Sequence, residues 1–155
     1  MQVKEIEKGK IEKILERNYG CRINFNEFKI LVNRKGKIFL FNENKIEENL
    51  LKIASYVGLY LGKLKRNGKI QLSTEGSQIV GPQAKKNIAV LNEENLRRYM
   101  EGLKCKWEKL INCEENNFIL IKYENDFYGS GILRKEYIES LVPKSRRVMT
   151  EIRKI

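Results

Sequence analysis

The chain contains no histidine, and its three cysteines, Cys21, Cys105 and Cys113, form no Cys-x-x-Cys pair of the kind that zinc and redox sites use. It also has no Gly-x-Ser-x-Gly motif, no Walker phosphate loop and no cysteine with a base at hand. We therefore expect no metal, no cofactor and no enzymatic activity. The enzymatic alternative, an RNA-modifying enzyme, would require a cofactor pocket in which ionisable groups converge.

Long hydrophobic runs are absent as well. The longest apolar runs, such as Phe118 to Ile121, are far too short to cross a bilayer. An odd number of cysteines without a signal-peptide pattern favours the reducing cytoplasm, so we expect a cytoplasmic protein without a membrane partner. Two alternatives stay open: an oxidised Cys105–Cys113 pair, and a membrane-surface role for the dispersed basic side chains.

Positive charge is abundant. Thirty-one Lys and Arg against 20 Asp and Glu give a net charge of +11, which suits a polyanionic partner. A composition adapted to hot environments also combines many acids and bases, but it does not explain the net excess. With 155 residues, 41% of them hydrophobic, the chain is large enough for one or two small folded domains.

The first part of the chain has the pattern of a helix, a hairpin and a second helix. Apolar residues at helical spacing predict a helix over Val3 to Arg17. Phe28 to Val32 and Lys37 to Phe41 are rich in β-branched and aromatic residues, and they flank a turn at Asn33 to Gly36. Helical spacing returns from Ile46 to Val57. We predict a small α/β domain over residues 1–55.

After Ser55, glycine-punctuated short strands predominate. Val57 to Lys65 and Lys69 to Leu72 predict a hairpin, because the Asn67-Gly68 pair between them favours a tight turn. Ser73 begins a short helix that ends at Gly81-Pro82, where glycine would adopt the left-handed cap. The remaining predicted elements are a strand over Asn87 to Leu91, a helix from Asn92 closed by Gly102, strands over Phe118 to Tyr123 and Phe127 to Leu133, and the segment Lys135 to Val142. Such a series is typical of a small barrel, here predicted for residues 56–155.

Several short motifs in this second part resemble a known family. They are Tyr56 to Lys63 (YVGLYLGK), Leu72-Ser73, Gly81 to Asn87 (GPQAKKN), Leu91 to Glu94 (LNEE), Gly129 to Gly131 (GSG) and Val142 to Arg147 (VPKSRR). In order and spacing they resemble the PUA-like domain of Fmu/Sun-type rRNA cytosine methyltransferases and its stand-alone archaeal relatives in ribosome biogenesis. The division at Ser55 is also similar to the nucleolar pre-ribosome factor that joins an N-terminal α/β domain to a C-terminal PUA domain.

The resemblance implies an α+β protein, with a small N-terminal α/β domain followed by a PUA-like β pseudobarrel with short helices. It implies binding of structured RNA, either rRNA or tRNA, through one edge of the barrel and the adjoining glycine-containing loop. The family's methyltransferase domain is missing from this sequence. This departure leaves open whether the protein acts alone or beside a partner enzyme in ribosome biogenesis or RNA modification. As an alternative, it would be a protein-interaction subunit that supports an RNA methyltransferase or ribosome assembly factor in trans.

Two basic clusters match the family's contact segments. Lys85 and Lys86 follow a Gly-Pro break, where backbone amides would be free to meet a phosphate together with the two ammonium groups. The alternative is an ordinary solvated turn. Lys144, Arg146 and Arg147 follow a proline, and the guanidinium groups of the two arginines suit bidentate phosphate contacts or stacking on a base. A solubilising tail is the competing interpretation there.

A third cluster lies on the predicted Asn67-Gly68 hairpin. Lys63 and Arg66, with Lys65 and Lys69, would concentrate positive charge at its tip. They predict either a second RNA contact or an edge strand protected from aggregation by its lysines. Aromatic residues in the strands favour core packing over base stacking; they are Tyr56, Tyr60, Phe127, Tyr128 and Tyr137.

Overall fold

The computed structural model describes residues 3–42 and 58–147, which form two five-stranded sheets. The first sheet is antiparallel and follows chain order, with strands β1 (Val3–Glu5), β2 (Phe28–Asn33), β3 (Lys37–Asn42), β4 (Leu59–Leu64) and β5 (Ile70–Leu72). Helix α1 (Lys8–Tyr19) covers one face, where Ile38 and Leu40 of β3 are buried. Phe39 and Phe41 alternate with them and form a separate cluster on the other face.

The prediction of one helix over Val3 to Arg17 is wrong at the start of the chain. Val3–Glu5 pairs with β2, and the helix begins only at Lys8. The N–H of Ile6 donates to the carbonyl oxygen of Ile30 at 2.9 Å, which extends the pairing by one residue. Without Val3–Glu5, the edge of β2 would present unpaired backbone N–H and C=O groups. Pairing these groups stabilises a strand here more than the helical spacing of the apolar residues stabilises a helix. The two predicted hairpins are confirmed as β2–β3 and β4–β5.

The second sheet is mixed. It consists of β6 (Ile88–Val90), β7 (Lys109–Ile111), β8 (Phe118–Tyr123), β9 (Asp126–Leu133) and β10 (Ile138–Ser140), in the order β10-β9-β8-β6-β7. Only the β6–β8 pair is parallel within these described strands. Cys105, which precedes β7, forms an antiparallel bridge with Ile138 of β10, so the two edges of the sheet approach each other. The sheet is therefore a partly closed barrel, covered by helix α4 (Glu93–Met100).

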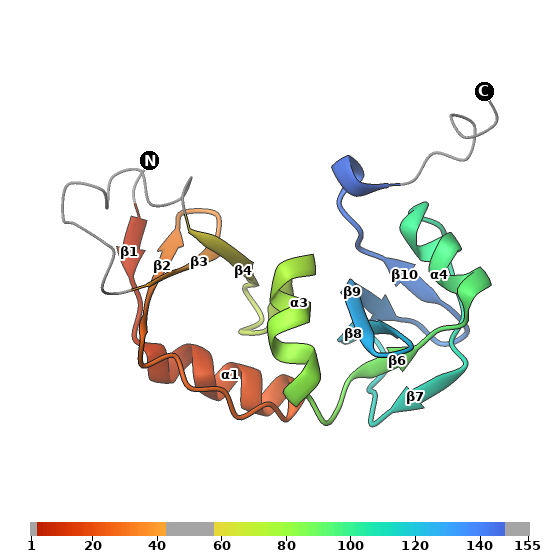
Figure 1. Cartoon of the computed structure of the whole chain (residues 1–155), viewed down its shortest axis with the longest axis horizontal. Helices are drawn as coiled ribbons and strands as arrows, with labels where there is room; N and C mark the ends of the chain where they lie inside the picture. Colours follow the sequence, from red (N-terminus) through yellow and green to blue (C-terminus); the bar gives the residue numbers. More distant parts are fainter. Residues whose placement is uncertain (1–2, 43–57, 148–155) are drawn as a thin grey trace.

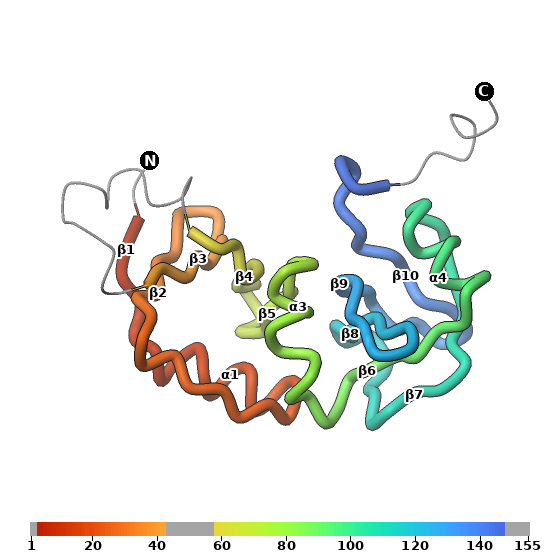
Figure 2. The backbone as a smooth tube through the Cα atoms, in the orientation of Figure 1, coloured from red at the N-terminus to blue at the C-terminus, as the bar shows by residue number. Residues whose placement is uncertain are grey.

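Helix α3 (Thr74–Val80) joins the two sheets. It begins at the predicted cap, where the Oγ of Ser73 accepts a hydrogen bond from the N–H of Gly76 at 2.9 Å. The helix contacts β4 of the first sheet and β9 of the second, and Figures 1 and 2 show it between them. Leu61 of the first sheet and Phe127 of the second lie in the same buried core. Both sheets consequently contribute to this core, while the second sheet and α4 also form a separate cluster.

The predicted domain boundary at Ser55 lies outside the described residues, as does the helix predicted for Ile46 to Val57. Strands from both sides of that boundary belong to one sheet, since β3 pairs antiparallel with β4. The division into residues 1–55 and 56–155 stays a prediction.

Gly81 ends α3 for a different reason from the predicted left-handed cap. Its φ of −51° is right-handed, and it begins the 3-10 helix η3 (Gly81–Gln83). A Cβ on Gly81 would collide with the ring of Phe127, so glycine is required by packing. Gly129 marks an irregularity in β9, because its φ is +129° and the β8–β9 register shifts beside it.

Two fully buried tyrosines make the fold sensitive to alkali. The hydroxyl of Tyr19 donates to the carbonyl oxygen of Ile70 at 2.6 Å, and that of Tyr99 donates to Ser130 at 2.8 Å. Burial raises the pKa of both phenols above the ordinary value of about 10. Below about pH 10 the phenols stay protonated in both the folded and the unfolded chain. Above it the unfolded chain loses its phenolic protons first, so stability falls as pH rises.

We expect each tyrosine to contribute a loss of about 1.4 kcal/mol in the free energy of unfolding between pH 9 and 11. Urea denaturation across this range measures the loss. Tyr19→Phe should lower stability at neutral pH, because it removes the hydrogen bond to Ile70, yet make the alkaline loss smaller. An unchanged alkaline loss in Tyr19→Phe would show that this phenol does not drive it.

Candidate nucleic-acid interface

Two hairpin turns of the first sheet lie side by side. In the β2–β3 turn, the N–H of Gly36 donates to the carbonyl oxygen of Asn33 at 3.0 Å. The N–H of Leu64 in β4 then donates to the carbonyl oxygen of Gly36 at 2.8 Å. Gly36 has a φ of +86°, and a Cβ there would lie 2.5 Å from the carbonyl oxygen of Leu64. Glycine at this position therefore brings the first turn against the strand that leads to the second.

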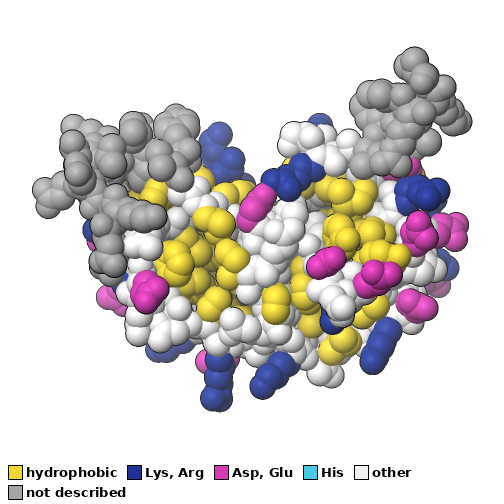
Figure 3. Space-filling view, viewed as in Figure 1, with side chains coloured by type: hydrophobic (Ala, Val, Ile, Leu, Met, Phe, Trp, Pro, Cys, Tyr) yellow, Lys and Arg dark blue, Asp and Glu magenta, His cyan; other side chains and the backbone are white. Residues whose placement is uncertain are grey.

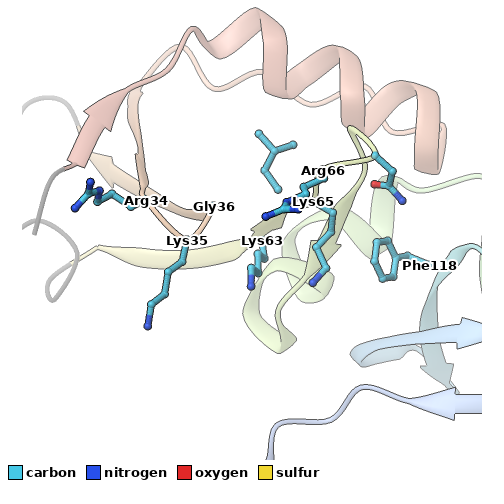
Figure 4. Close-up of a pocket in the computed structure, with 9 residues that line it drawn as sticks. Arg34, Lys35, Gly36, Lys63, Lys65, Arg66 and Phe118 are labelled. Carbon is cyan, nitrogen blue, oxygen red and sulfur yellow. The ribbon is translucent and has the colours of Figure 1, made fainter.

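The two turns enclose a cavity of about 800 Å³, here called the basic pocket (Figure 4). It is lined by Arg34, Lys35, Gly36, Lys63, Leu64, Lys65, Arg66, Asn67 and Phe118. Five of these nine residues are cationic and none is acidic. None of the five forms an ion pair with a residue in the described ranges. Their summed charge creates a positive potential suited to a polyanion.

The positive surface continues onto α1. A second cavity, of about 380 Å³, is lined by Lys10, Lys13 and Arg17 of the helix and shares Leu64 and Lys65 with the basic pocket. A ligand chain longer than one phosphate would therefore meet cations on both sides of the β4–β5 hairpin.

The distribution of charge along the chain agrees with this placement. Residues 1–72 contain 16 Lys and Arg against 8 Asp and Glu, whereas residues 73–155 contain 15 against 12. On the face seen in Figure 3, several acidic side chains gather over the half that contains the second sheet. Most of the excess positive charge thus belongs to the part of the chain that forms the first sheet.

The predicted residues fall in three places. Lys63 and Arg66 line the basic pocket together. Arg146 lines a different cavity, of about 290 Å³, and forms an ion pair with Glu75 of α3. Arg147 lies against Gly102, where a Cβ would be 2.5 Å from its Nε atom. The segment η4 (Lys144–Arg146) is therefore folded onto the protein, with all of its side chains exposed.

The prediction that the backbone amides of Lys85 and Lys86 are free is wrong. Both N–H groups donate to the carbonyl oxygen of Tyr19, at 2.8 and 3.2 Å. Tyr19 is the last residue of α1, and Gly20 follows it in the left-handed conformation. The loop thus donates hydrogen bonds to a carbonyl oxygen at the C-terminal end of α1. The helix macrodipole favours cationic side chains at this end. Contact between these two lysines and RNA stays a prediction.

Three residues of the basic pocket were missed in the sequence: Arg34, Lys35 and Phe118. The first two had a local signal, since they are adjacent cations in a recognised turn. Phe118 had none, because only the packing of β8 against the β4–β5 hairpin brings it to the pocket. Among the predicted core aromatics, Phe127 and Tyr128 pack in the cores, and Tyr60 packs against Phe39. Tyr56 lies outside the described residues.

Comparisons with known proteins bear on the fold. No protein-family model matches the chain, and no curated protein matches its sequence significantly. A conserved PUA domain protein from Thermoplasma acidophilum superposes with a TM-score of 0.63 and 13% identity, over 94% of this chain and 98% of the other. A PUA domain from Aeropyrum pernix K1, solved as a tartrate complex, superposes with a TM-score of 0.56 and 10% identity, over 94% and 89%. The chain therefore has the α+β fold of these PUA domain proteins.

Proposed function

We propose that this protein binds structured RNA without catalysing a reaction, and that the basic pocket is its main contact surface. The observation that carries the proposal is the convergence of five cations, with no acid, in one cavity. The fold shared with PUA domain proteins supports it, because the resemblance that the sequence motifs carry implies RNA binding.

The pocket combines two kinds of phosphate ligand. Arg34 and Arg66 offer planar guanidinium groups that hydrogen-bond two phosphate oxygens at once. Lys35, Lys63 and Lys65 supply mobile point charges that neutralise neighbouring phosphates. The lysines of α1 extend this surface along the backbone of the ligand. Lys85, Lys86, Lys144, Arg146 and Arg147 are proposed as additional contacts. Phosphate neutralisation and recognition of RNA shape would together determine binding.

The biological setting is part of the proposal. The resemblance to the Fmu/Sun-type domain and its stand-alone archaeal relatives favours rRNA or tRNA as the ligand. We further propose that the protein acts in ribosome biogenesis or RNA modification, with a methyltransferase or assembly factor as its candidate protein partner. The odd number of cysteines without a signal-peptide pattern favours the cytoplasm as its location. The alternative is a protein-interaction subunit whose basic surface is incidental.

Salt titration of RNA binding tests the proposal. If all five cations of the basic pocket neutralise phosphates, the logarithm of the binding constant should fall against the logarithm of salt with a slope of about −3.5 to −4.5. Fluorescence anisotropy with a labelled structured RNA measures the slope. A binding constant that does not depend on salt concentration, or the absence of RNA binding, contradicts the proposal. A stoichiometric protein partner that survives nuclease treatment in a pull-down, without RNA binding, would favour the protein-interaction subunit.

A further inference from the structure

We propose that Phe118 is a stacking platform for one unpaired RNA base, whose flanking phosphates are held by the cations of the basic pocket. This inference rests on the proposed function and specifies the ligand of the same site. It predicts that the protein prefers RNA with an unpaired nucleotide over a continuous duplex.

The ring of Phe118 is available for a ligand. Phe118 is only half-buried, and it lines the basic pocket beside Leu64 and Lys65. It belongs to none of the hydrophobic clusters formed by the described residues, although its neighbours Ile119 and Leu120 are fully buried core residues. In Figure 4 Phe118 stands at one end of the row of cationic side chains and Arg34 at the other. The ring is therefore the aromatic part of a cationic cavity.

The position of Phe118 is fixed by hydrogen bonds across the two sheets. The Nζ of Lys69, in the β4–β5 hairpin, donates to the Oδ1 of Asn117 at 2.8 Å. That oxygen also accepts the N–H of Phe118 at 3.0 Å, and the backbone carbonyl of Asn117 accepts from Leu133 at 3.1 Å. Asn117 itself is only 6% exposed. This network holds the start of β8, and with it the backbone of Phe118, against the hairpin that carries Lys63, Lys65 and Arg66.

An aromatic ring beside phosphate-binding cations suits a base that has left the helical stack. Bases inside an A-form duplex are stacked on one another and do not reach a side chain, whereas bases in bulges and loops do. Stacking on an aromatic side chain is tolerant of sequence, because every base has a π-face. A cavity of about 800 Å³ falls within the size range of small-ligand pockets. The pocket therefore fits one extruded nucleotide and its phosphates.

Two RNA hairpins test the inference: one fully paired in its stem, and one identical except for a single bulged nucleotide. At one salt concentration, the wild-type protein should bind the bulged RNA about tenfold or more tightly than the paired one. Phe118→Ala and Phe118→Leu should both abolish this preference, since leucine keeps apolar bulk but lacks a π-face. Phe118→Trp should keep it. The fluorescence of a 2-aminopurine base at the bulge should change when wild-type protein binds, and this change should be lost or altered with Phe118→Leu.

The outcomes separate this inference from the proposed function. Equal affinity of the wild-type protein for both hairpins, or a preference that survives in Phe118→Leu, overturns the stacking platform. If the Lys63→Glu/Arg66→Glu variant still loses affinity for both RNAs, the proposed function stands on its own. If wild-type protein binds neither hairpin, the proposed function fails, and the stacking platform with it. Thermal melts of every variant confirm that it is folded, so that a lost preference is not mistaken for unfolding.

Discussion

Replacing two cations of the basic pocket by acids, in the double variant Lys63→Glu/Arg66→Glu, should lower affinity for structured RNA by about 100-fold or more near physiological salt. Both side chains line the same cavity, and neither forms an ion pair with a described residue whose loss would complicate the result. Each contributes an attraction to phosphate that the variant converts to repulsion. The salt slope should become shallower by about 1.4 to 1.8, the value for two lost phosphate contacts.

The double variant Lys106→Glu/Lys109→Glu is the matched control. Both lysines are exposed, at β7 and just before it, at an edge of the second sheet. The control changes the net charge by the same four units, from +11 to +7. It should weaken binding less than about threefold, because exposed charges more than a Debye length from the ligand are largely screened. Equal losses in both double variants would show that dispersed charge, and not the basic pocket, attracts RNA.

Local signals in the sequence predicted much of the secondary structure. The Asn67-Gly68 pair predicted the β4–β5 hairpin, where Gly68 adopts a φ of +82°. Ser73 and Asn92 were predicted as helix caps, and each side chain accepts a hydrogen bond from the N–H three residues later. These features depend on two to four adjacent residues. They are therefore visible without knowledge of the rest of the fold.

Elements that depend on distant partners were not predictable in this way. Val3–Glu5 is a strand only because β2, over 20 residues later, offers it an edge. β7, absent from the predicted elements, is a short strand that pairs with β6. The sharing of one core by Leu61 and Phe127 likewise has no trace in local composition. Such pairings join segments that the sequence separates widely, and tertiary packing overrides local propensity there.

The candidate site likewise combines residues that local sequence signals predicted and residues that only tertiary contacts bring together. Lys63 and Arg66 were found because they flank a recognisable turn. Their convergence with Arg34 depends on the hydrogen bond from Leu64 to Gly36, which fixes how the two hairpins meet. The positive charge of each hairpin turn was thus predictable from the residues of that turn alone. The pocket, and the aromatic side chain within it, required the arrangement of both sheets.

The junction between the sheets should tolerate almost no added volume at Gly76. This residue lies in the first turn of α3, and a Cβ there would collide with the carbonyl oxygen of Leu61 in β4. That oxygen already accepts hydrogen bonds from the backbone N–H and the Oγ of Ser73, at 3.0 and 3.1 Å. Gly76→Ala should therefore push α3 away from β4 and break these bonds.

We expect Gly76→Ala to lower the free energy of unfolding by about 2 kcal/mol, because an overpacking cost of about 3 kcal/mol exceeds the gain in helix propensity of about 1 kcal/mol. Thermal denaturation should show a Tm roughly 4 to 8 °C lower. Gly9→Ala is the matched control, because Gly9 is exposed in α1 and a Cβ there meets nothing within 4 Å. Only the propensity gain applies to it, so its Tm should rise by about 2 °C or more. A Gly76→Ala protein as stable as wild type would contradict the close approach of α3 to β4, and with it the rigid connection between the two sheets.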